Sequence, residues 1–248
     1  MGPAFWEDLP VFMESLDRDD DVRCVVVAAS GPHFSVGLDL ASMGGGLSGS
    51  DGSASTGSVA EHRALYEGIL RMQGSVSSVA ACRKPVIAAV HGYCIGGGVD
   101  LIAACDIRLA SDDALFSVRE AKMAIVADIG SLQRLPSIIG AGHLAELAFT
   151  GKDIDAARAA RIGLVNDVVG GGAQGVLSAA RSLALEIAAN SPLAVQGTKA
   201  VLAANDGRTV AEGLEYVAWW NASYLRSDDL TEAMTAFFEK RPPKFTGR

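Results

Sequence analysis

The sequence predicts an α/β fold that ends in a helical carboxyl-terminal module. Short β-branched runs alternate with helix-like segments through the first two thirds of the 248 residues, the pattern of a layered or spiral α/β core. After about residue 170 only helical patterns follow. Hydrophobic residues make up 49% of the chain and charged residues 20%, so the composition suits a globular protein with a substantial core.

The predicted strands are short apolar runs, each bounded by charged residues, glycine or proline. They cover residues 22–30, 84–92, 106–111, 114–118 and 163–169. Helices are predicted between them by apolar residues at helical spacing, over residues 4–17, 61–80 and about 98–105. Pro10 is expected in the first turn of its helix or at a kink. A further helix over 128–140 has Asp128 as a plausible N-cap, and Gly140 follows its end.

Residues 41–60 are rich in glycine and serine and almost free of apolar residues. This composition predicts a mobile loop within the domain rather than a part of the core.

Further helices are predicted over 178–189, after Asn190-Ser191-Pro192, and over 213–225. A last helix is expected to start at Asp229, because Asp229 and Glu232 have the spacing of a capping box. We therefore divide the chain into a core over 1–189 and a helical module over 190–248.

Composition also argues against several classes of protein. The formal net charge of −8 argues against a general nucleic-acid binder, although a local basic cluster is still able to bind an anionic ligand. No apolar run approaches membrane-spanning length, and the amino terminus is unlike a signal or transit peptide, so the expected location is the cytoplasm. Histidines and cysteines show no metal-ligand spacing, and we expect the cysteines to be buried reduced thiols: Cys24, Cys82, Cys94 and Cys105.

Three consecutive glycines, Gly96, Gly97 and Gly98, lie between a predicted strand and a predicted helix. This arrangement leaves amide N–H groups unpaired at a helix amino terminus, where they stabilise negative charge. The glycine spacings of phosphate-binding loops are missing. An oxyanion hole for a carbonyl oxygen that gains charge is one explanation, and tight packing of the helix on the strand is the other.

The segment KPVIAAVHGYCIGGGVDLIAACDIRLAS, residues 84–111, resembles the central signature of the enoyl-CoA hydratase/isomerase (crotonase) superfamily. HFSVGLDL, 33–40, is similar to the family's Phe-x-x-Gly-x-Asp turn. The resemblance continues through segments at 133–140, 159–169, 190–202 and 233–247. It implies a crotonase-like spiral of repeated ββα units with a helical C-terminal trimerisation module, as a homotrimer or a dimer of trimers. Family members commonly carry one more strand before the 4–17 helix, and this strand has no counterpart in the sequence.

The resemblance also implies an acyl-CoA thioester substrate and site residues for it. The backbone amides of Val36 and Gly97 would form the oxyanion hole for the thioester oxygen. Asp100 and Glu120 fall where hydratases of the family carry two catalytic glutamates. Asp128 is a third acid, and this combination looks like the dienoyl-CoA isomerase branch. No cofactor is implied, because coenzyme A is part of the substrate, and no metal is implied.

The implied reaction shifts the double bonds of a 3,5-dienoyl-CoA to give the 2,4-isomer. A proton leaves C2 and one is delivered at C6, so two acids at different depths suit the chemistry better than one. Glu120 and Asp128 would form this proton shuttle, the oxyanion hole would stabilise the dienolate, and Asp100 would be a hydrogen-bonding or field-setting group. Each acid also has a simpler interpretation: Asp128 as an N-cap only, Glu120 as a solvated strand-end charge, and Asp100 as a helix-dipole partner.

For the coenzyme A end of the substrate, the resemblance implies Phe237 and Lys240 on the last helix, from the same or a neighbouring subunit. Arg241 and Lys244 are equally explained as a solvated tail. Trp219 and Trp220 suit either an interface or the core of one chain. Two other functions remain open at this point: an enoyl-CoA hydratase, and a non-catalytic acyl-CoA-binding protein.

Overall fold

The computed structural model describes residues 1–39, 41–42 and 58–248. The predicted loop over 41–60 falls mainly on 43–57, outside the described residues. The strands are β1 (Val25–Val27), β2 (Val86–Val90), β3 (Tyr93–Ile95), β4 (Ile107–Ser111), β5 (Leu115–Ser117), β6 (Ile154–Asp155) and β7 (Asp167–Val169). The helices before the carboxyl-terminal module are α1 (Pro3–Arg18), α3 (Val59–Ala81), α4 (Gly97–Ala103), the 3-10 helix η1 (Glu120–Met123), α5 (Ser131–Ile139), α6 (Ala141–Thr150), α7 (Ala156–Arg161) and α8 (Gly172–Ala188).

The described strands form two sheets, and the chain passes repeatedly from one to the other. One sheet has the order β1-β2-β4-β7 with all neighbours parallel. The other has the order β3-β5-β6, in which β3 and β5 are parallel. Ser35 forms a parallel bridge with Cys94 of β3, so the chain after β1 also joins the second sheet. The repeats β2-β3-α4 and β4-β5-η1 confirm the predicted α/β spiral.

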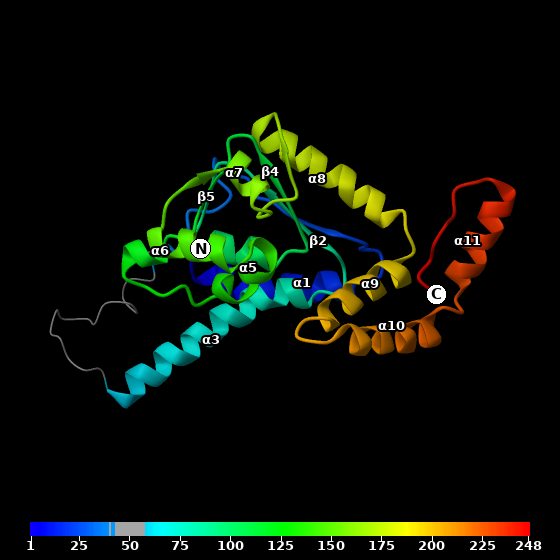
Figure 1. The fold of residues 1–248 in the computed structure, drawn as a ribbon, viewed down its shortest axis with the longest axis horizontal. Helices are drawn as coiled ribbons and strands as arrows, with labels where there is room; N and C mark the ends of the chain where they lie inside the picture. The colour runs from blue at the N-terminus through cyan, green and yellow to red at the C-terminus, as the bar shows by residue number, and fades with distance from the viewer. Residues whose placement is uncertain (40, 43–57) are drawn as a thin grey trace.

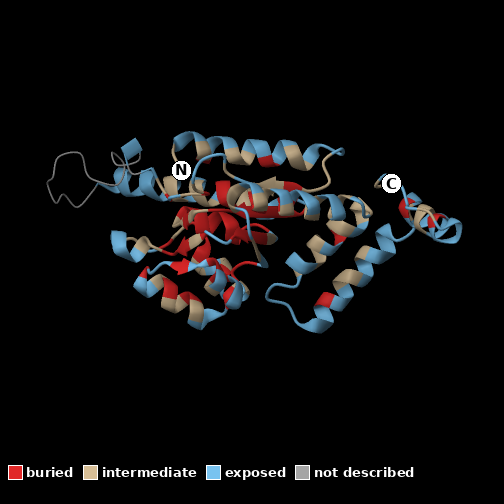
Figure 2. Cartoon of the chain, turned by 90° about the horizontal axis from the view of Figure 1, so that it is seen from above, coloured by how far each residue is buried: buried red, intermediate tan, exposed pale blue. Residues whose placement is uncertain are grey.

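The core lies on both faces of the parallel sheet. Helix α8 packs across β1, β2, β4 and β7, and its Val176 and Ala180 are buried against Ile87, Ala89 and Leu109. The opposite face of β2 belongs to the larger apolar cluster that reaches α1, α3, α4 and α5. Figure 2 shows the buried residues concentrated in this central layer. β2 is therefore buried on both faces, which explains its uninterrupted apolar sequence.

The carboxyl-terminal helices α9 (Pro192–Ala204), α10 (Val210–Tyr224) and α11 (Asp228–Glu239) extend away from the sheets (Figure 1). α9 begins as predicted, with Ser191 as its N-cap. Trp220 packs on α9, because a Cβ on Gly197 would lie 2.3 Å from its Nε1. Trp219 is 69% exposed. The division of the chain at residue 189 stays a prediction.

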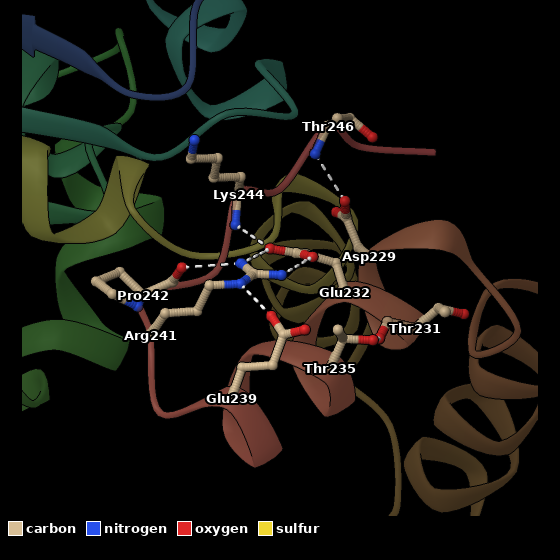
Figure 3. A network of polar contacts seen from close by, with 9 residues as sticks. All are labelled: Asp229, Thr231, Glu232, Thr235, Glu239, Arg241, Pro242, Lys244 and Thr246. Atoms are coloured by element: carbon tan, nitrogen blue, oxygen red, sulfur yellow. Dashed lines mark hydrogen bonds and ion pairs between the residues drawn. The ribbon is translucent and has the colours of Figure 1, made fainter.

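The predicted N-cap of the last helix is wrong. The Ser227 side chain caps α11 by accepting from the Leu230 N–H, which leaves the two acids of the predicted box free for the terminal tail (Figure 3). Asp229 accepts from the Thr246 N–H at 2.7 Å. Glu232 binds both terminal nitrogens of Arg241, at 2.6 and 2.9 Å. These bonds lower the pKa of Glu232 to about 2, and Arg241 joins the tail to α11 while its side chain stays partly exposed.

Ala124, which ends η1, carries backbone strain that a substitution should relieve. Its φ of 57° and ψ of 31° lie in the left-handed region, which costs a residue with a Cβ about 1–2 kcal/mol. Since glycine loses about 0.5–1 kcal/mol more on ordering, we expect Ala124→Gly to stabilise the fold by a net of about 0.5–1 kcal/mol. Urea unfolding measures this change.

Ala121→Gly is the matched control, because Ala121 lies in the same 3-10 helix without a positive φ. It should lose about 0.5–1 kcal/mol. An equal loss in both variants would mean that Ala124 is not strained.

Candidate active site

A cavity of about 460 Å³ opens where the second sheet meets α4 and η1. Its lining comes from separate parts of the chain: Val36, Gly37, Leu38, Tyr93, Ile95, Gly96, Gly97, Asp100, Arg119, Glu120, Met123, Ile125, Asp128, Ile129 and Asp153. The structure thus brings together five of the seven predicted site residues, which span positions 36 to 128 of the sequence.

The two amides predicted for the oxyanion hole lie on neighbouring segments. The Ser35 N–H donates to Tyr93 O at 2.9 Å, and the Ile95 N–H donates to Ser35 O at 3.0 Å. Val36 follows this pairing and Gly97 begins α4. Neither the Val36 N–H nor the Gly97 N–H donates to another described residue, and both residues line the cavity. Both donors are therefore available to a carbonyl oxygen.

The flanking glycines are required by close approach of the backbone. Gly96 has a φ of 56°, and a Cβ there would lie 3.2 Å from Glu120 Oε1. Its N–H is already bonded to Ser117 O. A Cβ on Gly98 would lie 2.8 Å from Ser35 Cβ. The packing explanation of the glycine run therefore holds for Gly96 and Gly98, and it is compatible with a free amide at Gly97 between them.

Asp100 lies in the first turn of α4 and is 1% exposed. Its Oδ1 accepts from the Ser131 N–H at 2.5 Å, at the first turn of α5. Burial raises the pKa of Asp100, and the charge of Asp128 raises it further, against the bonds from Ser131. The contact links Asp100 to a second helix besides its own. Ser131 does not line the cavity but supports Asp100 from α5, a role that the predicted helix start at Asp128 did not reveal.

Glu120 begins η1 and lines the cavity close to Gly96. Its Oε2 is buried and has no hydrogen-bond partner among the described residues. Burial raises the pKa of Glu120, and the charges of Asp100 and Asp128 add to the effect. A solvated strand-end charge does not fit this burial, so that simpler interpretation is wrong.

Asp128 is not an N-cap, which corrects the predicted start of its helix. α5 begins at Ser131 with Gly130 as the N-cap. Gly130 has a φ of 134° and turns the chain before the helix. The Asp128 carboxylate makes no hydrogen bond to another described residue, and burial raises its pKa. It is a half-buried acid that lines the cavity without a structural partner there.

An ion pair that the sequence did not reveal forms part of the wall. Arg119 pairs with Asp153, and both line the cavity. The guanidinium of Arg119 keeps the pKa of Asp153 low. The cavity lining therefore contains two kinds of charged group. One is the ion pair of Arg119 with Asp153, and the other is the set of three acids whose pKa is raised.

Phe237 and Lys240 are not near this cavity in the same chain. Both lie at the end of α11, which Figures 1 and 2 place far from the sheets. Phe237 is 77% exposed and Phe238 is 73% exposed, with their rings edge to face. Lys240 ends α11 in the left-handed conformation. Their role in binding coenzyme A stays a prediction.

Comparison with known proteins connects this cavity to a family. The family model for enoyl-CoA hydratase/isomerase matches residues 2–248. A mitochondrial Delta(3,5)-Delta(2,4)-dienoyl-CoA isomerase of Dictyostelium discoideum is 46% identical over 99% of this chain and 82% of that protein. A peroxisomal isomerase of the same name from Arabidopsis thaliana is 45% identical over 97% and 86%. A crystal structure of enoyl-CoA hydratase from Bacillus anthracis superimposes with a TM-score of 0.89 at 28% identity, and covers 100% of this chain and 90% of that one.

Proposed function

This chain belongs to the enoyl-CoA hydratase/isomerase family, and we infer that it is a dienoyl-CoA isomerase with a crotonase fold. The observation that carries the inference is the third acid: Asp128 lines one cavity with Asp100 and Glu120. The substrate is an acyl-CoA thioester, and the reaction belongs to fatty-acid β-oxidation. Relatives with this activity match nearly the whole chain.

The geometry supports a division of labour within the cavity. The Val36 and Gly97 amides bind the thioester oxygen, so that removal of a proton from C2 yields an enolate delocalised as far as C6. Return of a proton at C6 leaves double bonds at C2 and C4. Glu120 and Asp128 carry the two protons, because both have a raised pKa and neither carboxylate has all its oxygens paired. Asp100, which is held by Ser131, sets the field around them.

The charges in the cavity favour unequal protonation of the acids. Burial and mutual repulsion raise the pKa of Glu120 and Asp100. In such a group one carboxyl keeps its proton at a pH where its neighbour has lost it. A shuttle needs this difference, since one acid must accept a proton while the other donates.

Assembly and coenzyme A binding belong to the same proposal. Large apolar side chains are exposed on the last three helices: Leu202, Val210, Leu214, Trp219, Tyr224, Met234, Phe237 and Phe238. They support assembly of the chain through these helices, and the assembly that we propose is a homotrimer or a dimer of trimers. In such an assembly Phe237 and Lys240 approach the nucleotide end of coenzyme A bound to a neighbouring copy.

The compartment stays a prediction. The sequence predicts the cytoplasm, whereas the relatives' names place them in mitochondria or peroxisomes. Within the described residues, no helix has both the length and the apolar character needed to cross a bilayer.

Turnover of two substrates tests the function. We expect the protein to convert 3,5-dienoyl-CoA with the rise in absorbance of a conjugated 2,4-dienoyl thioester. Hydration of 2-enoyl-CoA, which is measured as the loss of enoyl absorbance, should be much slower than isomerisation. Rapid hydration without action on the diene would assign a hydratase instead, and acyl-CoA binding in calorimetry without turnover of either would assign a non-catalytic binder.

A further inference from the structure

We propose that Gln73 of helix α3 is a positioning residue for Asp128, an inference that rests on the proposed function. Gln73 does not line the cavity. It acts through the backbone of the acid rather than through the substrate. No pattern in the sequence singled it out, because one glutamine in a helical segment is unremarkable until its partner is known.

The contact joins two parts of the chain that are 55 residues apart. Gln73 Nε2 donates to the Asp128 backbone oxygen at 2.6 Å. Because the Asp128 carboxylate has no hydrogen bond to another described residue, its position in the cavity depends on how its backbone is held. Gln73 supplies that hold from outside the cavity.

A second tether reaches the same loop from the next turn of α3. Arg134 Nη2 donates to Ser77 Oγ at 2.9 Å, and Arg134 Nη1 donates to Ile129 O at 3.4 Å. Gln73 and Ser77 are four residues apart and share a helix face. Arg134 crosses closely over Gly130, where a Cβ would lie 1.8 Å from Nη1. The loop 128–130 is therefore held at two successive points along α3.

Helix α3 is a rigid support for this purpose. Val76 and Val79 are fully buried on it, and both belong to the main core cluster. The same helix also packs against α4, which carries Asp100. One helix thus sets the position of two of the three acids relative to each other.

Loss of the Gln73 donor should affect the rate more than the binding. A displacement of about 1 Å at a catalytic group is able to cost about 10²-fold in rate. For Gln73→Met we expect kcat for isomerisation to fall by about 10- to 100-fold, with KM changed by less than about threefold. Gln133→Met is the matched control, because Gln133 is exposed on α5 and should leave both values unchanged.

Gln73→Glu gives a readout that a merely structural role would not move. An ionised glutamate cannot donate to the Asp128 oxygen, but a protonated one can, with the same shape. We therefore expect the ratio of variant to wild-type kcat to rise as the pH falls from 8 to 5. A ratio that is constant with pH, or a Gln73→Met variant with unchanged kcat, would overturn the proposal.

A substrate-free measurement separates this inference from the function itself. Carbon-13 NMR of labelled aspartate follows the Asp128 carboxyl through its titration in the wild type, Gln73→Met and Gln133→Met. A shifted midpoint in Gln73→Met alone is the expected result, and identical titrations in all three would overturn the positioning role. If the wild type does not convert dienoyl-CoA, the proposed function fails, and this titration still decides whether Gln73 positions Asp128.

Discussion

Replacing Asp128 by asparagine should lower kcat for isomerisation of 3,5-dienoyl-CoA by about 10²- to 10⁴-fold, the contribution of a positioned acid or base. Asparagine keeps the size of the side chain and the backbone bond from Gln73, but it cannot accept and return a proton. KM should change little, because the oxyanion-hole amides and the apolar wall are retained. Stopped-flow absorbance of the conjugated product measures the loss.

The control for this experiment is Asp206→Asn, an exposed acid after α9 that does not line the cavity. It should leave kcat unchanged. Any slow hydration of 2-enoyl-CoA should also persist in Asp128→Asn, because Asp100 and Glu120 remain. If Asp128→Asn isomerised 3,5-dienoyl-CoA at the wild-type rate, Asp128 would not be in the proton path. The main structural support for an isomerase would then be lost.

The parts of the fold that the sequence predicted well are those fixed by local composition. β2 and β4 were predicted from apolar runs, since strands buried in a parallel sheet leave little choice of residue. The short strands β3 and β6 were not singled out. They exist because a partner strand lies alongside, and a run of two or three residues carries no period of its own.

Helix starts were mispredicted where two capping residues competed. Asp128 precedes a glycine with positive φ, and the chain turns there before α5 begins. Asp229 lies two residues after Ser227, and it is the Ser227 side chain that makes the capping bond. In the folded chain Asp128 lines the cavity, and Asp229 bonds to the terminal tail, so neither acid caps a helix. Local spacing alone cannot tell whether such an acid caps a helix, because its alternative role depends on parts of the chain that are far away in the sequence.

The site shows the same limit. Spacing gave no sign that Val36, Gly97 and Asp128 share one cavity, and only the family resemblance implied it. The supporting contacts from Ser131 and Gln73 were missed, because each is a hydrogen bond between residues far apart in the sequence. Ser131 donates its backbone N–H, and Gln73 donates its side-chain amide. The acids stand out because they are carboxylates that line a largely apolar cavity. Ser131 and Gln73, which support them, are residue types that occur commonly in helices and give no signal in the sequence.

The oxyanion hole itself is tested most directly at Gly98. A methyl group there would lie 2.8 Å from Ser35 Cβ, between the segment that presents the Val36 amide and the helix that presents the Gly97 amide. Gly98→Ala must therefore push these two donors apart. We expect kcat to fall by about 10²- to 10³-fold, the effect of losing one oxyanion donor, while overpacking costs about 1–3 kcal/mol of stability.

Gly142→Ala in α6 separates the loss of the donor from the general effect of a new methyl group. Its Cβ would meet nothing within 4 Å, so alanine should be neutral or slightly stabilising in that helix and leave kcat unchanged. Circular dichroism and urea unfolding establish that Gly98→Ala is folded under assay conditions. If this folded variant turned over dienoyl-CoA at the wild-type rate, the two amides would not converge on the thioester oxygen. The enolate would then need another stabilising group, and Arg119 is the cation that lines the described cavity.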